Sequence, residues 1–290
     1  MATAVKQGFT ILKSSLEITD LQEETVSTRH NNVRLAIAQE LRALESFLTG
    51  SYSRHTMIAP LSKADVDVFV VLHPSYYEPN GQARLLDKVK RVLTKKYPNT
   101  SEISRNGQAV TIRFSDFAVD VVPAFARSGG GYIIPSTRGI RRWIETDPRI
   151  HVEISSRENK AHNGELVPLV KMIKCWNRAV DEYFRSFHLE VLAWAIFQEC
   201  QIADYPSAIR YFFQQGSELI LQRNPDPAGY NDDVGFYVHT RRKCRLHAAA
   251  LFARAYHRAC KAEEYDRQGK AEHAINEWRK IFGSYFPAYG

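Results

Sequence analysis

Hydrophobic residues recur at roughly helical spacing over the first fifty positions of the chain. The apolar positions are Leu21, Val26, Val33, Leu35, Ile37, Leu41, Leu44 and Leu48. Asp20 precedes this series and is a residue type that caps helices. The pattern therefore predicts a helical segment that begins after Asp20 and ends near Gly50.

The pattern then changes to that of β-strands. Residues 65–72 (DVDVFVVL), 108–114 (QAVTIRF) and 117–125 (FAVDVVPAF) are rich in β-branched residues and largely alternate in polarity, as strands do. Between the first two, leucines and valines on one side of residues 83–95 predict a helix. Three consecutive glycines at 129–131 predict a loop.

From about residue 162 onward the chain reads as a series of helices. The expected helices are residues 165–182, 187–200, 206–223, 239–265 and 269–282, with a loop at 224–235 that holds two prolines and two glycines. We therefore expect an α+β fold, with a mixed half over residues 1–160 and a helical half over 161–290. Because no low-complexity linker separates them, we expect the halves to pack together.

Composition narrows the class of protein. The chain has 290 residues, 44% hydrophobic and 24% charged, as in an ordinary globular protein. No apolar run approaches the roughly 18 residues of a membrane span, and the polar first thirteen residues do not resemble a signal peptide. Four cysteines without a C-x-x-C pair favour free thiols over a zinc site and a reducing, cytoplasmic compartment.

The net charge of +7 suggests a polyanionic ligand such as a nucleotide or a nucleic acid. Solubility alone would also explain such a balance, so the charge needs support from a specific site.

Three aspartates in the predicted strands supply that support. Residues two apart in a strand point to the same face, so Asp65 and Asp67 project side by side while the valines between and after them face the core. Asp120 lies within an apolar strand, where a carboxylate needs a partner. A neighbouring strand that places Asp120 beside the pair would bring together three carboxylates, which suit Mg²⁺.

The segment before the first aspartates suits phosphate. Gly50 and Ser51 form a turn of small residues, in which a backbone amide and a hydroxyl can approach a phosphate. Two Mg²⁺ ions, or Mn²⁺ in their place, stabilise both the attacking and the leaving oxygen in a phosphoryl displacement. A D-x-D motif alone also occurs on solvated strands. The prediction therefore depends on the order of the Gly-Ser turn, the D-x-D strand and the aspartate in a later apolar strand.

These motifs resemble the active site of polymerase-β-type nucleotidyltransferases, through GSYSRHT, DVDVFVV and VDVVPAF in that order. Further segments extend the resemblance to the bacterial CD-NTases, the cGAS/DncV-like synthases with a SMODS domain. These segments are FTILKSSLEIT, WIETDPRIH, NGELVPLVKMIKCWN, SFHLEVLAW, NPDPAGYNDDV and AINEWRKIFGSYFP.

The resemblance implies a polymerase-β-like palm, with a mixed sheet and a long N-terminal helix, packed against a C-terminal helical lobe. It implies that nucleoside triphosphates, ATP or GTP or both, are joined into a cyclic di- or oligonucleotide messenger in CBASS antiphage defence. By position it places metals on Asp65, Asp67 and Asp120, phosphates on Gly50 and Ser51, and the donor triphosphate on Lys174 and Ser186.

Helical geometry gives the Lys174 assignment an alternative. Lys171, Lys174 and Arg178 fall on one helix face, opposite Leu169 and Ile173. This face either meets triphosphate charge or is a solvated basic face. Arg54, in the phosphate-binding turn, similarly contacts either the triphosphate or solvent.

Two other charged groups lie outside this scheme. Asp226 and Asp233, in the loop at 224–235, either approach the nucleotide or stabilise the loop as Asx turns. A basic cluster, residues 241–243 with Arg245, is either a nucleic-acid patch or the solvated start of a helix.

Two alternative functions remain open. The same residues would serve a synthase of linear oligonucleotides or an RNA-tailing transferase, while a catalytically dead nucleotide- or RNA-binding protein is disfavoured by the intact aspartates. The chain lacks the spacing of a His-and-Cys zinc insertion, so a nucleic-acid activator acting through it is not supported. A CBASS regulatory partner could act at the C-terminus, where Gly290 would suit conjugation.

Overall fold

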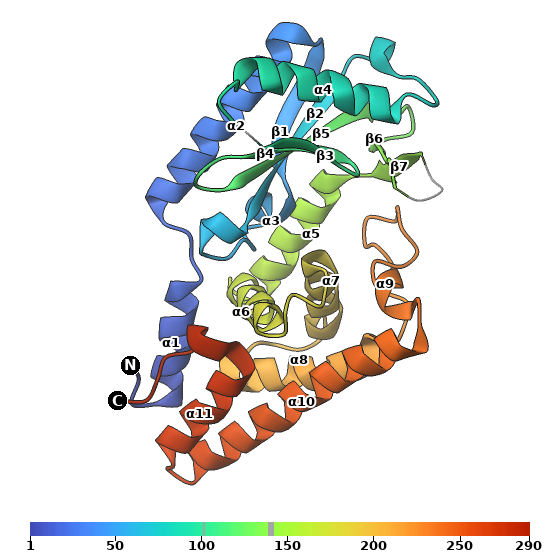
Figure 1. Cartoon of the computed structure of the whole chain (residues 1–290). Helices are drawn as coiled ribbons and strands as arrows, with labels where there is room; N and C mark the ends of the chain where they lie inside the picture. Colours follow the sequence, from blue (N-terminus) through green and yellow to red (C-terminus); the bar gives the residue numbers. More distant parts are fainter. Residues whose placement is uncertain (101, 139–141) are drawn as a thin grey trace. The chain divides into compact units, whose positions relative to one another are not determined.

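The computed structural model describes residues 1–100, 102–138 and 142–290. Contacts divide the chain into two compact units. One is the sheet unit, Ile18–Val152; the other is the helical unit, Met1–Glu17 together with Glu153–Gly290. Strands and helices are both abundant (Figure 1), which confirms the expected α+β class.

The helices and strands follow one another along the whole described chain. The helices are α1 (Val5–Ser15), α2 (Asp20–Glu40), α3 (Gly50–Ser53), α4 (Gln82–Lys96), α5 (Pro148–Ala161), α6 (Leu166–Ala179), α7 (Ser186–Phe197), α8 (Tyr205–Leu219), α9 (Phe236–His239), α10 (Arg242–Arg267) and α11 (Ala271–Phe282). The strands are β1 (Ala43–Thr49), β2 (Asp65–Leu72), β3 (Ile103–Asn106), β4 (Ala109–Arg113), β5 (Ala118–Ala126), β6 (Tyr132–Pro135) and β7 (Trp143–Thr146).

The sheet of the first unit is mixed. Its main path runs β1-β2-β5-β4-β3, and β6 and β7 continue from β5. Only β2 and β5 pair in parallel among the described strand pairs. Helices α2 and α4 cover one side of this sheet (Figure 1).

The two faces of β2 differ in what they contact. Val66 and Val68 are buried in a core that includes Ile37 of α2 and Leu86 of α4. Residues of the other parity, including Phe69, pack in a separate small cluster. The sequence-based orientation of β2 is therefore confirmed: its aspartates point away from α2 and α4.

The expected continuous helix to Gly50 is wrong after residue 40. Residues 43–49 form β1, which pairs antiparallel with β2 along its length. Hydrogen bonding to the central strand overrides the helical spacing of Leu44 and Leu48, because pairing partners far along the chain do not show in local periodicity. The helix begins one residue earlier than expected, with Thr19 as its cap and Gln22 completing a capping box.

Short elements were also missed. Strands β3, β6 and β7 have four residues each, too few to produce a clear alternation. Helix α5 was not expected either. The five predicted C-terminal helices are present with shifted ends: the predicted segment 239–265 corresponds to α10, and the short α9 precedes it.

The helical unit takes in the N-terminal helix. Phe9 of α1 is buried with its ring at 4.9 Å from Trp278 and 5.2 Å from Phe286. Backbone pairing between Ala2 and Tyr289 continues this contact at the two chain ends. The compact units therefore group residues 1–17 and 153–160 with the helices, unlike the domains 1–160 and 161–290, which stay a prediction.

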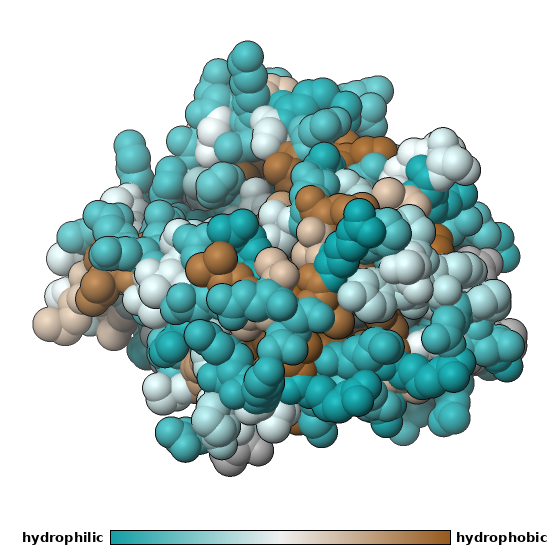
Figure 2. All heavy atoms as spheres, turned by 90° about the horizontal axis from the view of Figure 1, so that it is seen from above, coloured by the Kyte–Doolittle hydropathy of each residue, from teal (hydrophilic) through white to brown (hydrophobic). Residues whose placement is uncertain are grey.

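The surface and the helices show no membrane segment in the part of the chain described. None of the described helices is both long enough and apolar enough to span a bilayer. The face drawn in Figure 2 is mostly hydrophilic, with hydrophobic residues in small groups.

Candidate active site

The register of the sheet brings two of the aspartates together. Asp67 of β2 is paired with Asp120 of β5, and Asp65 lies two residues before Asp67. Paired residues on neighbouring strands, about 4.8 Å apart, point to the same face. All three carboxylates therefore lie on the face of the sheet away from α2 and α4, as the strand pattern predicted.

The Asp120 carboxylate is mostly buried and is held by a neighbour. Thr111, its partner on β4, donates a hydrogen bond from Oγ1 to Asp120 Oδ1 at 2.5 Å. Burial raises the pKa of Asp120 above its usual value, the Thr111 hydrogen bond opposes this, and the negative charge of Asp65 adds to the rise. A raised pKa beside a second carboxylate is what a cation would relieve.

Gly50 lies against the carboxylate of Asp67. Thr49, the last residue of β1, pairs with Asp67, and the chain then turns into α3 with Gly50 at a φ of +66°. A Cβ on Gly50 would stand 1.8 Å from Asp67 Oδ2. Only glycine fits this close approach, so the structure brings the Gly-Ser turn and the aspartates into one place.

Backbone hydrogen bonds close the turn that holds Ser51. The carbonyl of Ser51 accepts from the backbone N–H groups of Thr56 at 2.9 Å and Met57 at 3.1 Å. Arg54, within the turn, is only 8% exposed. The alternative of a solvent-exposed surface arginine is therefore wrong, and Arg54 remains a candidate for ligand contact.

The donor set of this face fits magnesium. Carboxylate oxygens are the ligands that Mg²⁺ takes from proteins, commonly one or two of them together with substrate phosphates. Within the described ranges, no three aspartate, glutamate, histidine or cysteine side chains form a group that could hold a metal ion. A metal ion at the face shared by Asp65, Asp67 and Asp120 would therefore also need oxygen ligands from a bound phosphate.

Lys174 lies in the helical unit and is buried. Its Nζ is 3.4 Å from Glu190 Oε1 of α7, and the Glu190 side chain is fully buried. Lys171, one turn earlier, is likewise buried and bonds Glu17 at 2.5 Å. The solvated-face alternative is therefore wrong for these lysines: acidic side chains hold them in fixed positions.

Ser186 opens α7 and is exposed. The first backbone N–H groups of a helix have no intrahelical acceptor, which makes this a position where phosphate is well received. Its assignment to the triphosphate stays a prediction, as do those of Gly50, Ser51, Arg54, Lys174 and the three aspartates.

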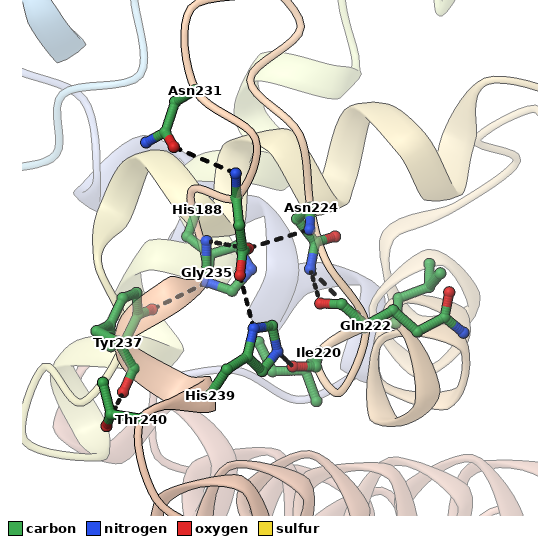
Figure 3. Close-up of polar contacts among 11 residues, drawn as sticks. His188, Ile220, Gln222, Asn224, Asn231, Gly235, Tyr237, His239 and Thr240 are labelled. Carbon is green, nitrogen blue, oxygen red and sulfur yellow. Dashed lines mark hydrogen bonds and ion pairs between the residues drawn. The ribbon is translucent and has the colours of Figure 1, made fainter.

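The loop aspartates make bonds that stabilise their own loop. Asp226 Oδ1 accepts from Ala228 N at 3.0 Å, an Asx turn. Asp233 bonds the backbone of Asn224 and the ring of His239; both partners are labelled in Figure 3. The loop-stabilising role that the sequence left open is thus present for both.

Sequence reasoning missed Thr111 and Glu190. Thr111 is a polar residue at a buried position of a strand, and Glu190 is an acid within an apolar helix; such positions signal a buried partner. The partner's identity depends on register and helix packing, which the sequence alone does not show.

Residues 3–159 match the sequence profile of the SMODS family, the Second Messenger Oligonucleotide or Dinucleotide Synthetase domain. The chain belongs to this family. The SMODS chain is therefore a nucleotidyltransferase that makes an oligonucleotide or dinucleotide second messenger, as the resemblance implied.

Known proteins resemble this SMODS chain along most of its length. The cyclic AMP-AMP-AMP synthase of an Acinetobacter strain is 25% identical, over 97% of this chain and 85% of that protein. Escherichia coli CdnC, solved in complex with HORMA, matches 98% of both chains with a TM-score of 0.75 and 18% identity. Vibrio cholerae DncV matches 98% of this chain and 96% of its own with a TM-score of 0.81 and 13% identity. These structural matches confirm the expected fold.

Proposed function

We propose that the chain joins ATP into a cyclic oligoadenylate that serves as a messenger in CBASS antiphage defence. The observation that carries this proposal is the register pairing of Asp67 with Asp120, with Gly50 against the Asp67 carboxylate. The choice of ATP is supported by the Acinetobacter relative, which is named a cyclic AMP-AMP-AMP synthase.

In this proposal each part of the site has one task. The three aspartates hold two Mg²⁺ ions, or Mn²⁺, which when bound neutralise phosphate charge and favour ionisation of the attacking hydroxyl. The backbone of Gly50 and the hydroxyl of Ser51 hold phosphates, and Arg54 adds positive charge beside them. Lys174 and Ser186 contact the donor triphosphate.

The reaction is a phosphoryl displacement. A ribose hydroxyl of one nucleotide forms a bond to the α-phosphorus of another, the bond to the β-phosphate oxygen breaks, pyrophosphate leaves and the hydroxyl proton passes to solvent. Positioning and charge stabilisation supply most of the rate enhancement in such transfers. Ring closure repeats the same displacement within the linear intermediate.

Mass spectrometry of the product tests this proposal. Purified protein with Mg²⁺ receives ATP alone, GTP alone or both, and products are treated with phosphatase before analysis. A phosphatase-resistant product of adenylate units supports the proposal. A product with phosphatase-sensitive ends indicates a linear synthase. A product that forms from GTP without ATP overturns the choice of ATP as substrate.

The double variant Asp65→Asn, Asp67→Asn is the control for chemistry at this site. It keeps the shape of both side chains and removes their charge, so we expect an intact fold and no turnover. Turnover by this variant would place the reaction elsewhere, and a wild-type protein that binds nucleotide without turnover would support the binding-protein alternative.

A protein partner is a second part of the proposal. The CdnC relative was solved in complex with HORMA, which supports regulation of this chain by a comparable protein. Size-exclusion chromatography with a HORMA protein from the same genome tests it: co-elution and a changed rate of pyrophosphate release support the partner, and separate elution contradicts it.

A further inference from the structure

A cavity of about 300 Å³ opens in the helical unit, where the end of α8, the short α9 and the first turn of α10 meet. Two arginines, Arg223 and Arg245, line it together with Phe236 and Leu221. Its volume is at the lower end of the range for small-molecule sites. None of the residues that we assign to ATP or metal lines it.

One side of the cavity is made rigid by Asp233. Its Oδ1 accepts from the backbone N–H groups of Asn224 at 3.2 Å and Gly235 at 2.8 Å, and its Oδ2 lies 2.7 Å from His239 Nδ1. Figure 3 shows three of the partners, Asn224 and Gly235 of the loop and His239 of α9, close together. Burial favours a raised pKa for Asp233, but the hydrogen bonds prevail and lower it, so the carboxylate stays ionised.

The Asp233 carboxylate and its partner His239 are both held in place by hydrogen bonds. The other ring nitrogen of His239, Nε2, lies 3.3 Å from the carbonyl oxygen of Ile220. Both ring nitrogens of His239 are thus within hydrogen-bonding distance of an oxygen. Asp233 therefore acts as a structural anchor within the cavity wall.

The two arginines carry charge with no acidic partner. Among the described residues, neither Arg223 nor Arg245 forms a salt bridge within 4 Å, and both are exposed. Guanidinium groups bind phosphate through paired, charge-assisted hydrogen bonds. The cavity thus offers two free cations to an anion.

An aromatic ring lies beside these cations. Phe236 is 48% exposed, unusual for a phenylalanine in a compact unit. The guanidinium of Arg185 lies 4.7 Å from its ring centroid, which fixes the ring by a cation–π contact. With Leu221, it gives the cavity an apolar wall for a flat group.

We propose that this cavity binds a nucleoside monophosphate as a second nucleotide site, one that none of the residues assigned to ATP or metal lines. The phosphate is held by Arg223 and Arg245, and the base lies against Phe236. A nucleoside phosphate combines the anion and the planar ring that these walls select. The proposal does not rest on the identity of the messenger or on the aspartate site.

Titration calorimetry with AMP, in the presence of EDTA, tests the cavity. AMP has no pyrophosphate to lose, and EDTA removes metal, so no turnover interferes. We expect the double variant Arg223→Ala, Arg245→Ala to raise the Kd for AMP at least about tenfold, from the loss of two charge-assisted contacts. Phe236→Ala should raise the Kd for AMP by about threefold to tenfold and leave that for inorganic phosphate unchanged.

Two control variants make the test specific. Arg241→Ala, Lys243→Ala removes the same number of exposed positive charges from residues that do not line the cavity, and should leave the Kd for AMP nearly unchanged. Asp65→Asn, Asp67→Asn should also leave it unchanged while abolishing synthesis.

Three results would overturn the second site. The first is that the wild-type protein does not bind AMP. The second is that the Arg241→Ala, Lys243→Ala control loses as much affinity for AMP as the cavity variant does. The third is that AMP binding depends on Asp65 and Asp67 but not on the cavity arginines. None of them bears on messenger synthesis, so the two proposals fail separately.

Discussion

Replacing Gly50 with alanine tests the link between the Gly-Ser turn and the carboxylates. The added Cβ would stand 1.8 Å from Asp67 Oδ2 and 2.8 Å from its Cγ. Ordinary van der Waals contact begins near 3.4 Å, so the carboxylate or the turn must move by about 1.6 Å, the difference between the two distances.

The variant carries two separable costs. An alanine at a φ of +66° is strained by roughly 1–2 kcal/mol, whatever its surroundings. The displacement of Asp67 adds a cost to catalysis, since a misplacement of about 1 Å at a reacting centre lowers rates on the order of 100-fold. We therefore expect kcat to fall by about 100-fold or more, with a loss of stability close to that of strain alone.

Gly269→Ala is the matched control. Gly269 has a φ of +72° and no atom within 4 Å of an added Cβ, so it carries the backbone strain without the clash. Pyrophosphate release measures kcat for both variants, and thermal unfolding measures Tm. Both should lower Tm by similar amounts, while only Gly50→Ala should lose activity.

Equal activity in the two alanine variants would refute this reasoning. It would mean that the turn at Gly50 is not coupled to the position of Asp67 during the reaction, and that the glycine serves the local backbone alone.

Three further predictions concern buried polar contacts. Thr111→Val removes the hydrogen bond to Asp120 and should raise the Mg²⁺ concentration needed for half-maximal pyrophosphate release. Thr111→Ser keeps the hydroxyl and should behave like the wild type. An unchanged Mg²⁺ dependence in the valine variant would contradict a positioning role for Thr111. Lys174→Met leaves the fully buried Glu190 carboxylate without this ammonium partner, so it should lower the free energy of unfolding, measured by denaturant titration, by about 3–5 kcal/mol. It should also raise KM for ATP. The double variant Lys174→Met, Glu190→Gln should recover the free energy of unfolding but keep the raised KM. Burial lowers the pKa of His188 to about 4. As pH falls from 6.5 to 4, the unfolded chain therefore binds a proton that the folded protein does not, and the free energy of unfolding falls by about 3 kcal/mol. Denaturant midpoints measured across this range should fall less in His188→Asn than in the wild type.

The local alternation of polar and apolar residues was sufficient to predict the central strands and the face of the sheet on which the aspartates lie. Strand β2 has the bounds that the alternation of residues 65–72 predicted, because its two faces differ sharply in polarity. The family resemblance, carried by ordered motifs, gave the activity that the SMODS match confirms.

What the sequence could not show depends on contacts between distant segments. β1 has helical spacing but is a strand because β2 offers it a partner. The sequence predicts that Lys171 and Lys174 face solvent or nucleotide, yet Glu17, between α1 and α2, and Glu190 of α7 pair with them. The cavity beside Phe236 needs three segments to meet, which no single stretch of sequence displays.

The packing of α1 on α11 has a consequence for synthesis of the chain on the ribosome. Phe9 is made among the first residues, yet its partner Trp278 follows 269 positions later, about 15 to 50 s at a typical rate of translation. During this interval the apolar side of α1 has no α11 to cover it, while the sheet unit, continuous from Ile18 to Val152, has already been completed. The sheet unit should therefore fold first, and the helical unit can close only after the last helix is released.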